Sequence, residues 1–167
     1  EGIQGRILQA SPLLEAFGNA KTLRNNNSSR FGKFIEIWFG PDQTEIVRCV
    51  NTTYLLEKSR IVQQEQNERN YHIFYQFLKG SDDNDIENFG LKEVAKNPLS
   101  SKFLSGGQCV SIPNVSDKAT YKETIESMDH LGFEKKHKDQ LFKILAGILC
   151  LGQIEFRLDN EDKASLI

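Results

Sequence analysis

Cysteines are few in this sequence, and their spacing excludes the sites that cysteines usually build. Cys49, Cys109 and Cys150 are the three cysteines in a chain of 167 residues, and no two of them form a Cys-x-x-Cys pair. Neither a zinc site nor a disulfide framework is therefore indicated. We expect three free, buried thiols in a protein kept in a reducing compartment.

Long apolar runs and an excess of one charge are missing as well. The chain carries 21 Lys and Arg against 23 Asp and Glu, and this net charge of −2 argues against a nucleic-acid partner. The longest apolar run, at 144–151, is far shorter than the ~18 residues of a membrane span. The composition instead suits one soluble domain, or one subdomain of something larger.

Local patterns at the start of the chain predict a helix followed by a loop. One helix is expected to end near Gln9 and another to begin at Ser11-Pro12, because serine can cap a helix and proline fits its first position. Gly18 is expected to end this second helix. The segment 19–30 is polar and rich in Asn and Ser, whose side chains compete for backbone hydrogen bonds, so it is predicted to be a loop.

A β-hairpin is predicted next. The stretches 34–39 and 45–55 are rich in β-branched and aromatic residues, which favour strands. Gly-Pro-Asp at 40–42 supplies a turn between them. The following residues at 60–62 are expected to form a short extended stretch.

The second half of the chain is predicted to be mainly helical. The apolar spacing i, i+3, i+4, i+7 over 71–78 indicates a helix that ends at Gly80. An acidic surface loop is expected at 81–85 and a short helix at 86–95. Two prolines and a Gly-Gly pair predict mostly loop over 97–115.

Two further helices and a strand complete the prediction. Asp117 is expected to cap a helix that runs to Leu131, and 138–151 is the most apolar helix. Gly147 within it is interpreted as a site of close packing, since glycine is otherwise unfavourable in a helix. Residues 154–156 are predicted to form a strand. The residues of 138–151 expected to face the core are Leu141, Ile144, Leu145, Ile148 and Leu149.

The segment 25–30, Asn-Asn-Asn-Ser-Ser-Arg, carries the groups that phosphoryl transfer needs. That reaction depends on positioning and charge stabilisation more than on covalent chemistry. Serine hydroxyls can ligate Mg²⁺ or contact a γ-phosphate, asparagine amides can donate to phosphate oxygens, and arginine can pair with a carboxylate. On composition alone, however, such a loop is more often a solvated turn.

Four ordered blocks of sequence change that balance. The first is Leu-Leu-Glu-Ala-Phe-Gly-Asn-Ala-Lys-Thr at 13–22, which runs into Asn-Asn-Asn-Ser-Ser-Arg-Phe-Gly-Lys-Phe at 25–34. The others are Tyr-Leu-Leu-Glu-Lys-Ser-Arg at 54–60, Glu-Arg-Asn-Tyr-His-Ile-Phe-Tyr-Gln at 68–76, and the run at 144–156. Together they cover almost the whole chain, and their order resembles the myosin motor domain around its switch I loop.

The resemblance implies a role for each matching position of the loop. Ser28 and Arg30 would be catalytic: Ser28 would contact the γ-phosphate and relay a proton from the attacking water, and Arg30 would pair with a switch II glutamate. Ser29 would ligate Mg²⁺. The nucleotide-binding residues would be Asn25, Asn26, Asn27 and Ser28, with Asn26 and Asn27 mainly shaping the loop. Residues 57–60 and 68–76 are assigned to structure, and His72 is interpreted as a packed or surface residue rather than a catalyst.

The resemblance also implies a fold and partners. The expected fold is mixed α/β, part of the P-loop NTPase-type motor core in its upper 50 kDa region, with antiparallel strands packed by helices. The chain 1–167 would be a partial motor domain with the switch I loop at 19–30, a β-hairpin at 31–56 and a mostly helical part at 69–152. The parent protein would be an ATPase that uses MgATP and actin filaments, with possible light chains, in the cytoplasm and at the cytoskeleton.

Other parts of such a motor are missing from the sequence. It contains no Gly-x-x-x-x-Gly-Lys-[Ser/Thr] phosphate loop and no switch II partner for Arg30. We therefore expect an internal piece of a longer protein, which by itself is inactive and binds MgATP weakly or not at all. Two alternatives stay open. One is a non-catalytic myosin-like binding module, and the other is a kinesin-type motor, in which Ser-His is expected where Phe31-Gly32 stands.

Overall fold

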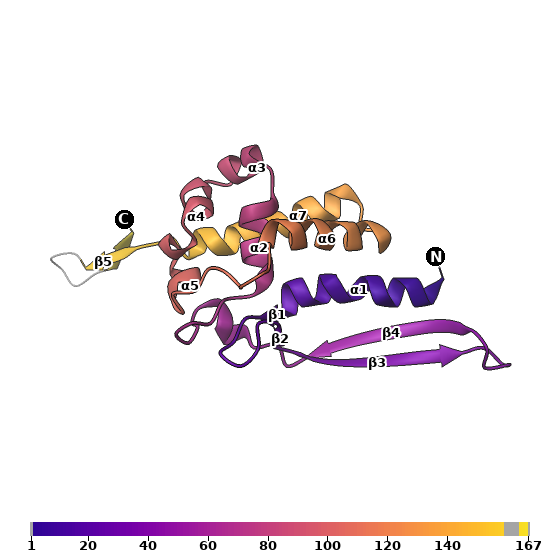
Figure 1. Cartoon of the computed structure of the whole chain (residues 1–167). Helices are drawn as coiled ribbons and strands as arrows, with labels where there is room; N and C mark the ends of the chain where they lie inside the picture. The colour runs from indigo at the N-terminus through magenta and orange to yellow at the C-terminus, as the bar shows by residue number, and fades with distance from the viewer. Residues whose placement is uncertain (1, 159–163, 167) are drawn as a thin grey trace.

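Helix α1 (Ile3–Gly18) lies between a long β-hairpin and a helical body in the computed structural model, which describes residues 2–158 and 164–166. Figure 1 shows the hairpin below this helix and most of the remaining helices above it. Helix α1 packs against α2, α6 and strand β4, so it joins the two parts. The mixed α/β class with antiparallel strands is confirmed.

The prediction of two helices around Ser11-Pro12 is wrong, because α1 is continuous and Pro12 lies inside it. Proline inside a helix removes one backbone hydrogen bond and costs about 3 kcal/mol. Contacts of α1 with elements on both sides offset that cost, which a local sequence pattern does not reveal. The predicted end at Gly18 is confirmed.

The 19–30 loop is closed by a small ladder. Strands β1 (Asn19–Ala20) and β2 (Ser28–Ser29) are antiparallel and pair Asn19 with Ser29 and Ala20 with Ser28. Ala20 also forms a bridge to Tyr71, at the start of the central helix. Backbone pairing therefore holds the two ends of the 19–30 loop together.

The predicted hairpin is confirmed. Strands β3 (Gly32–Phe39) and β4 (Ile46–Tyr54) pair in antiparallel register, with an irregularity between Trp38 and Phe39. The predicted extended stretch at 60–62 is wrong, because η1 (Lys58–Ile61) is a 3₁₀ turn. The ion pair between Glu57 and Arg60 spans three residues, which a turn permits and an extended chain does not.

Helix α2 (His72–Gly80) is the centre of the helical body, and seven of its nine residues are buried. The predicted acidic loop and single helix after it are instead two helices, α3 (Asp83–Asn88) and α4 (Lys92–Lys96). The side chain of Asp82 accepts from the backbone of Asn84 and so starts α3 early. Gly90, at φ +69°, separates the two helices.

Short turns and two long helices follow. The segment predicted as mostly loop contains only η2 (Pro98–Ser100) and α5 (Lys102–Ser105). Helix α6 (Asp117–His130) is capped by Ser116, whose hydroxyl accepts from Ala119, and not by Asp117 as predicted. Helix α7 (Lys135–Leu151) begins three residues before its predicted start.

The core face predicted for α7 is partly wrong. Leu145 and Leu149 are buried as expected, but Ile144 is 62% exposed, and Phe142 and Ala146 are buried instead. Phe142 stacks on Phe77 of α2 with ring centres 5.4 Å apart, which orients the helix. The close packing expected at Gly147 is also wrong, since a Cβ there would meet no atom within 4 Å.

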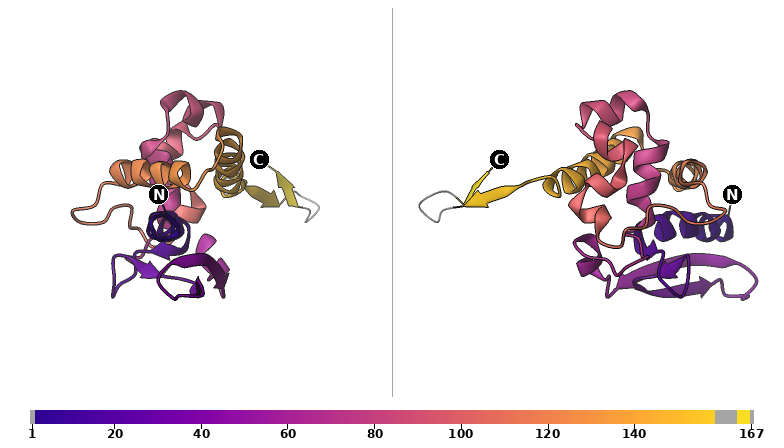
Figure 2. Two further views of the ribbon diagram at one scale, coloured as in Figure 1. Left: turned by 90° about the vertical axis from the view of Figure 1, so that its right-hand side faces the viewer. Right: turned by 60° about the vertical axis from the view of Figure 1, so that its left-hand side comes forward.

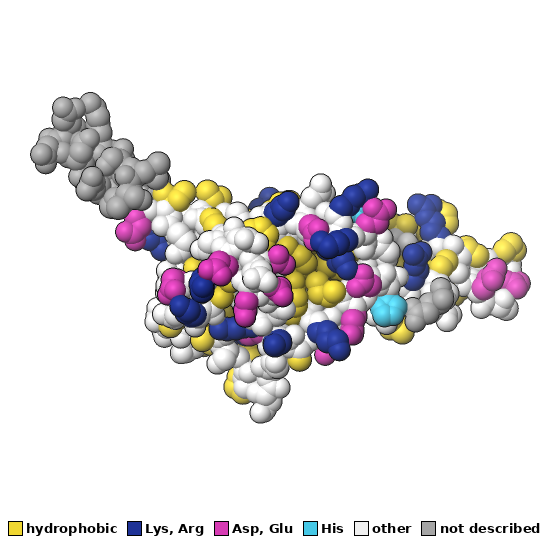
Figure 3. All heavy atoms as spheres, turned by 90° about the horizontal axis from the view of Figure 1, so that it is seen from above, with side chains coloured by type: hydrophobic (Ala, Val, Ile, Leu, Met, Phe, Trp, Pro, Cys, Tyr) yellow, Lys and Arg dark blue, Asp and Glu magenta, His cyan; other side chains and the backbone are white. Residues whose placement is uncertain are grey.

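Strands β5 (Phe156–Leu158) and β6 (Ala164–Leu166) pair beyond the end of α7 and project away from the helices (Figures 1 and 2). The strand predicted at 154–156 therefore begins two residues later. Viewed from above, the molecule shows Lys and Arg intermixed with Asp and Glu around an apolar centre (Figure 3). This mixture agrees with the near-neutral composition.

Two expectations about solvent exposure can be compared with the structure. The three cysteines are free as predicted, but none is buried, and Cys150 is exposed. Within residues 2–158 and 164–166, no helix has the length and apolar character needed to cross a membrane.

Candidate functional site

The 19–30 loop is held in shape by its own backbone and polar side chains. The amide of Arg30 donates to the carbonyl of Gly18 at 2.9 Å, and that of Thr22 donates to Asn25 at 2.8 Å. The side chain of Asn25 accepts from the amide of Asn27 at 2.8 Å. The Asn25 side chain therefore satisfies a backbone amide that neither a helix nor a sheet satisfies.

Asn27 is exposed, but its side chain contacts α1, α2 and the start of the loop. Its Nδ2 donates to Glu15 of α1 at 2.8 Å, and its Oδ1 lies 3.0 Å from Asn19 Nδ2 and 3.1 Å from His72 Nε2. Burial, followed by the charge of Arg69, lowers the pKa of His72 to about 4, so the ring is neutral at pH 7. Of the two positions expected for His72, packed or at the surface, the structure shows the packed one, and the ring contacts Asn27.

The hydroxyl group of Ser28 accepts a hydrogen bond, whereas the hydroxyl group of Ser29 donates one. Arg30 Nη1 donates to Ser28 Oγ at 3.3 Å, so Ser28 keeps its own proton to donate elsewhere. Ser29 Oγ donates to the carbonyl of Phe31 at 3.0 Å, so its lone pairs stay available to a cation. The loop therefore places one hydroxyl donor next to one hydroxyl acceptor.

The remaining predicted positions are Asn25 and Asn26, whose side chains are exposed. The structure thus brings Ser28, Ser29 and Arg30 together on one short segment, while Asn27 is occupied on the inner side. No group of three His, Cys, Asp or Glu side chains that could hold a metal occurs among the described residues. A metal at this loop would take the Ser29 hydroxyl with oxygens of the substrate and water, as Mg²⁺ commonly does.

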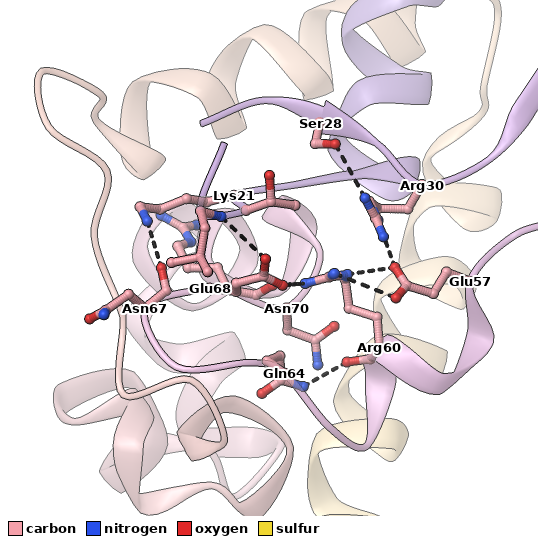
Figure 4. A network of polar contacts seen from close by, with 12 residues as sticks. Lys21, Ser28, Arg30, Glu57, Arg60, Gln64, Asn67, Glu68 and Asn70 are labelled. Atoms are coloured by element: carbon pink, nitrogen blue, oxygen red, sulfur yellow. Dashed lines mark hydrogen bonds and ion pairs between the residues drawn. The ribbon is translucent and has the colours of Figure 1, made fainter. Parts of the chain in front are cut away.

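Arg30 has a partner within the chain. Its Nε lies 2.6 Å from Glu57 Oε2, although 27 residues separate the two (Figure 4). The amide of Glu57 also donates to the carbonyl of Arg30 at 3.0 Å, so both main chains are tied at this point. The side chains of Arg30 and Glu57 are 29% and 32% exposed, respectively.

Glu57 belongs to a chain of charges that reaches the other end of the loop (Figure 4). Its Oε2 also accepts from Arg60 Nε at 2.7 Å, and Arg60 Nη1 donates to Glu68 Oε2 at 2.9 Å. Glu68 Oε1 in turn accepts from the amide of Leu23 at 3.2 Å. Burial raises the pKa of Glu57, but the bonds from Arg30 and Arg60 outweigh it and lower that pKa overall.

The backbone reinforces the same connection. The amide of Arg69 donates to the carbonyl of Lys21 at 3.0 Å, and Lys21 Nζ donates to the carbonyl of Asn67 at 2.6 Å. The segment 57–70 therefore supports both the start and the end of the 19–30 loop.

From the sequence alone, Glu57, Arg60 and Glu68 have a structural role and no visible connection with the loop. The local signal was only a cluster of charged residues, which usually indicates a solvated surface. Arg60 is 5% exposed and Glu68 is 8% exposed, so this cluster is an internal network and not such a surface.

A cavity of about 450 Å³ lies on the inner side of the loop, between α1, α2 and α6. Asn26, Asn27 and His72 line it together with Glu15 and Gln76. Because this side of the loop faces a cavity, Asn27 can move slightly without any rearrangement of the packed core.

Comparisons with known proteins give one consistent result. The profile of the family described as myosin head (motor domain) matches residues 1–167. Proteins named Myosin-1 from Emericella nidulans and Coccidioides immitis are each 46% identical over 160 residues, which is 96% of this chain and 12% of the relative. Myosin-1 of Saccharomyces cerevisiae is 46% identical over 165 residues, 99% of this chain and 8% of the relative. The chain therefore spans only a small part of these curated relatives.

Proposed function

This chain belongs to the myosin head (motor domain) family, and from that premise we propose that it supplies the switch I loop of an actin-based, ATP-hydrolysing motor. The motor domain of this family is of the P-loop NTPase type. The actin filament would bind through regions outside this sequence, and so would any light chains. The parent would accordingly be cytoplasmic and associated with the cytoskeleton.

The observation that carries the proposal is the opposite polarity of the two serine hydroxyls. Ser28 accepts from Arg30 and retains its proton, which suits contact with a γ-phosphate oxygen or the attacking water. Ser29 donates to Phe31 and retains its lone pairs, which suits a hard cation. If Ser28 donated its proton and Ser29 accepted one, the roles expected for the two hydroxyl groups would be reversed.

Mg²⁺ fits the Ser29 oxygen because magnesium prefers oxygen ligands and keeps several waters. When bound, it neutralises charge on the phosphate oxygens of ATP. Asn25 presents an exposed amide to those oxygens, and Asn26 and Asn27 mainly shape the loop. Arg30 closes the loop by pairing with a switch II glutamate from another part of the motor.

The proposal is tested by Ser29→Ala in the motor domain that contains this chain. We expect single-turnover ATP hydrolysis to fall by roughly 100-fold or more, because the hydroxyl ligand and its positioning are both lost. Raising the Mg²⁺ concentration should recover part of the loss. Ser100→Ala is the control, since that hydroxyl donates only to Asn97 in a distant turn. Unchanged hydrolysis in Ser29→Ala would contradict the metal-ligand role of Ser29, whereas no hydrolysis by the unmodified motor domain would favour a non-catalytic binding module.

The isolated chain provides a second test. We expect titration of the purified chain with MgATP to show weak binding or none, because its sequence contains no phosphate loop. Tight stoichiometric binding would contradict this expectation.

A further inference from the structure

One carboxylate, that of Glu57, serves two arginines at once. Glu57 Oε2 accepts from Arg30 Nε at 2.6 Å and from Arg60 Nε at 2.7 Å, and Glu57 Oε1 lies 3.5 Å from Arg60 Nη2 (Figure 4). A carboxylate oxygen has two lone pairs, so both bonds can exist together. Glu57 therefore remains paired if either arginine leaves.

Arg60 is the fixed member of this group. Its side chain is 5% exposed, and its Nη1 donates to Glu68 at 2.9 Å and to the carbonyl of Arg69 at 3.1 Å. Removing Arg60 from these acceptors would leave a buried carboxylate without its partner, which is costly. Arg60 thus stays on Glu57 whatever Arg30 does.

Arg30 is the movable member. Its backbone is tied to Gly18 and Glu57, but its side chain is 29% exposed. Its Nε is bound to Glu57 and its Nη1 to Ser28, whereas Nη2 donates to no acceptor among the residues that the structure describes. Rotation of the side chain can therefore turn the guanidinium toward a second carboxylate without moving the loop backbone.

We propose that Glu57 is the resting partner of Arg30 and a positioning residue of the switch. It holds Arg30 while the nucleotide site is open, and it releases Arg30 to the switch II glutamate when the site closes. Arg60 lowers the free-energy cost of this exchange, because it keeps Glu57 paired after Arg30 has left. This inference rests on the proposed function of the loop.

The pairing of Arg30 with Glu57 also predicts whether loss of Glu57 favours the open or the closed state. Reopening of the site ends with the return of Arg30 to Glu57, so Glu57 stabilises the open state relative to the closed one. Loss of its charge weakens the pairs with both arginines, but only the pair with Arg30 differs between the open and closed states. That pair is about one-third exposed, and such pairs contribute modestly. The equilibrium between open and closed states should therefore shift toward closed by about two- to fivefold.

The test is Glu57→Gln in the motor domain that contains this chain, since glutamine keeps the shape and removes the charge. We expect phosphate release after a single turnover to slow by about two- to fivefold. The phosphate burst should not fall, and the affinity for ATP should not decrease, because the closed state that holds the nucleotide is favoured. The unfolding midpoint should fall only slightly, since Arg60 keeps Glu68 and the carbonyl of Arg69 as acceptors. Glu93→Gln is the matched control, because that glutamate pairs with Lys96 on an exposed surface away from the loop.

A second variant separates positioning from a general structural effect. With Arg30→Ala as the background, Glu57→Gln should have no additional effect on phosphate release, because Glu57 acts only through Arg30. Single-turnover conditions make this comparison possible even when hydrolysis is slow.

The outcomes separate this inference from the proposed function. If Glu57→Gln speeds or does not alter phosphate release, or acts equally in the Arg30→Ala background, the resting-partner role is overturned while the switch I role stands. If Arg30→Ala alone leaves hydrolysis and release unchanged, the proposed function itself fails.

Discussion

Arg69 and Asp117 lie 48 residues apart in the sequence and form a bidentate ion pair. Arg69 Nη2 lies 2.7 Å from Asp117 Oδ1, and Arg69 Nη1 lies 3.2 Å from Asp117 Oδ2. The Arg69 side chain has no exposed surface, and its guanidinium lies 3.8 Å from the centre of the Tyr75 ring. The pair joins the start of α6 to the segment that supports the 19–30 loop. It therefore couples the helical body to the candidate site.

Asp117→Ala should lower the free energy of unfolding by about 3–5 kcal/mol, because it leaves a buried arginine without its carboxylate. The measurement is the urea midpoint of the purified chain, followed by circular dichroism. Asp139→Ala is the matched control, since Asp139 also lies 2.7 Å from its partner, Lys135, but on the surface. We expect no measurable change for the control. Equal effects of the two variants would show that burial of the pair does not matter.

His72 should make the chain less stable in mild acid. Burial, followed by the charge of Arg69, lowers its pKa to about 4 in the folded chain, whereas the unfolded value is near 6.5. The unfolded state therefore takes up a proton first as the pH falls, and stability is lost between about pH 6.5 and pH 4. The total contribution is about 3 kcal/mol at 1.36 kcal/mol per unit of pKa.

Urea unfolding measured from pH 7 to pH 4 tests this expectation. His72→Gln should flatten the loss of stability over that interval, because glutamine does not titrate. His130→Gln, at an exposed position of α6, should leave the pH dependence as it is. A curve for His72→Gln that runs parallel to that of the unmodified chain would assign the acid sensitivity to other groups.

The isolated chain should self-associate through its hairpin. Phe34 and Trp38 lie on one face of β3, by the alternation of side chains along a strand, and are 59% and 51% exposed. Exposed apolar surface of this kind marks a region that another surface normally covers. Replacing both by threonine should raise the monomer fraction in sedimentation velocity, since threonine keeps the strand and removes much of the apolar area.

Val62→Thr is the control for the hairpin experiment. Val62 is 58% exposed but stands at the end of η1, outside the hairpin, so its replacement should not change the monomer fraction. A monodisperse unmodified chain would contradict the expected self-association.

Gly147→Ala should stabilise the chain by about 0.5–1 kcal/mol, because alanine is the better helix former and its Cβ meets no atom within 4 Å. Thermal unfolding of the purified chain measures the difference. Gly107→Ala should act in the opposite direction, since its Cβ would lie 2.1 Å from the carbonyl oxygen of Glu68. Destabilisation by Gly147→Ala would mean that the close packing expected from the sequence exists after all.

Local patterns were sufficient where the decisive interactions are local. The apolar spacing over 71–78 predicted α2, and the turn after Phe39 predicted the hairpin, because period and turn chemistry depend on adjacent residues. Local patterns failed where distant residues decide. Ser11-Pro12 was expected to begin a second helix, but contacts of α1 on both sides keep one helix continuous through Pro12. Ile144 has the spacing of a core residue, yet the packing of Phe142 on Phe77 turns it toward solvent.

The sequence by itself determined the family, the mixed α/β class and the candidate residues Ser28, Ser29 and Arg30, because these depend on ordered motifs and local chemistry. Only the tertiary structure decided which hydroxyl donates, which accepts and where Arg30 finds its carboxylate. Glu57 is 27 residues from Arg30, and no periodicity connects them. Ion pairs depend on distance in space, so their partners are set by the fold that brings the segment 57–70 against the 19–30 loop.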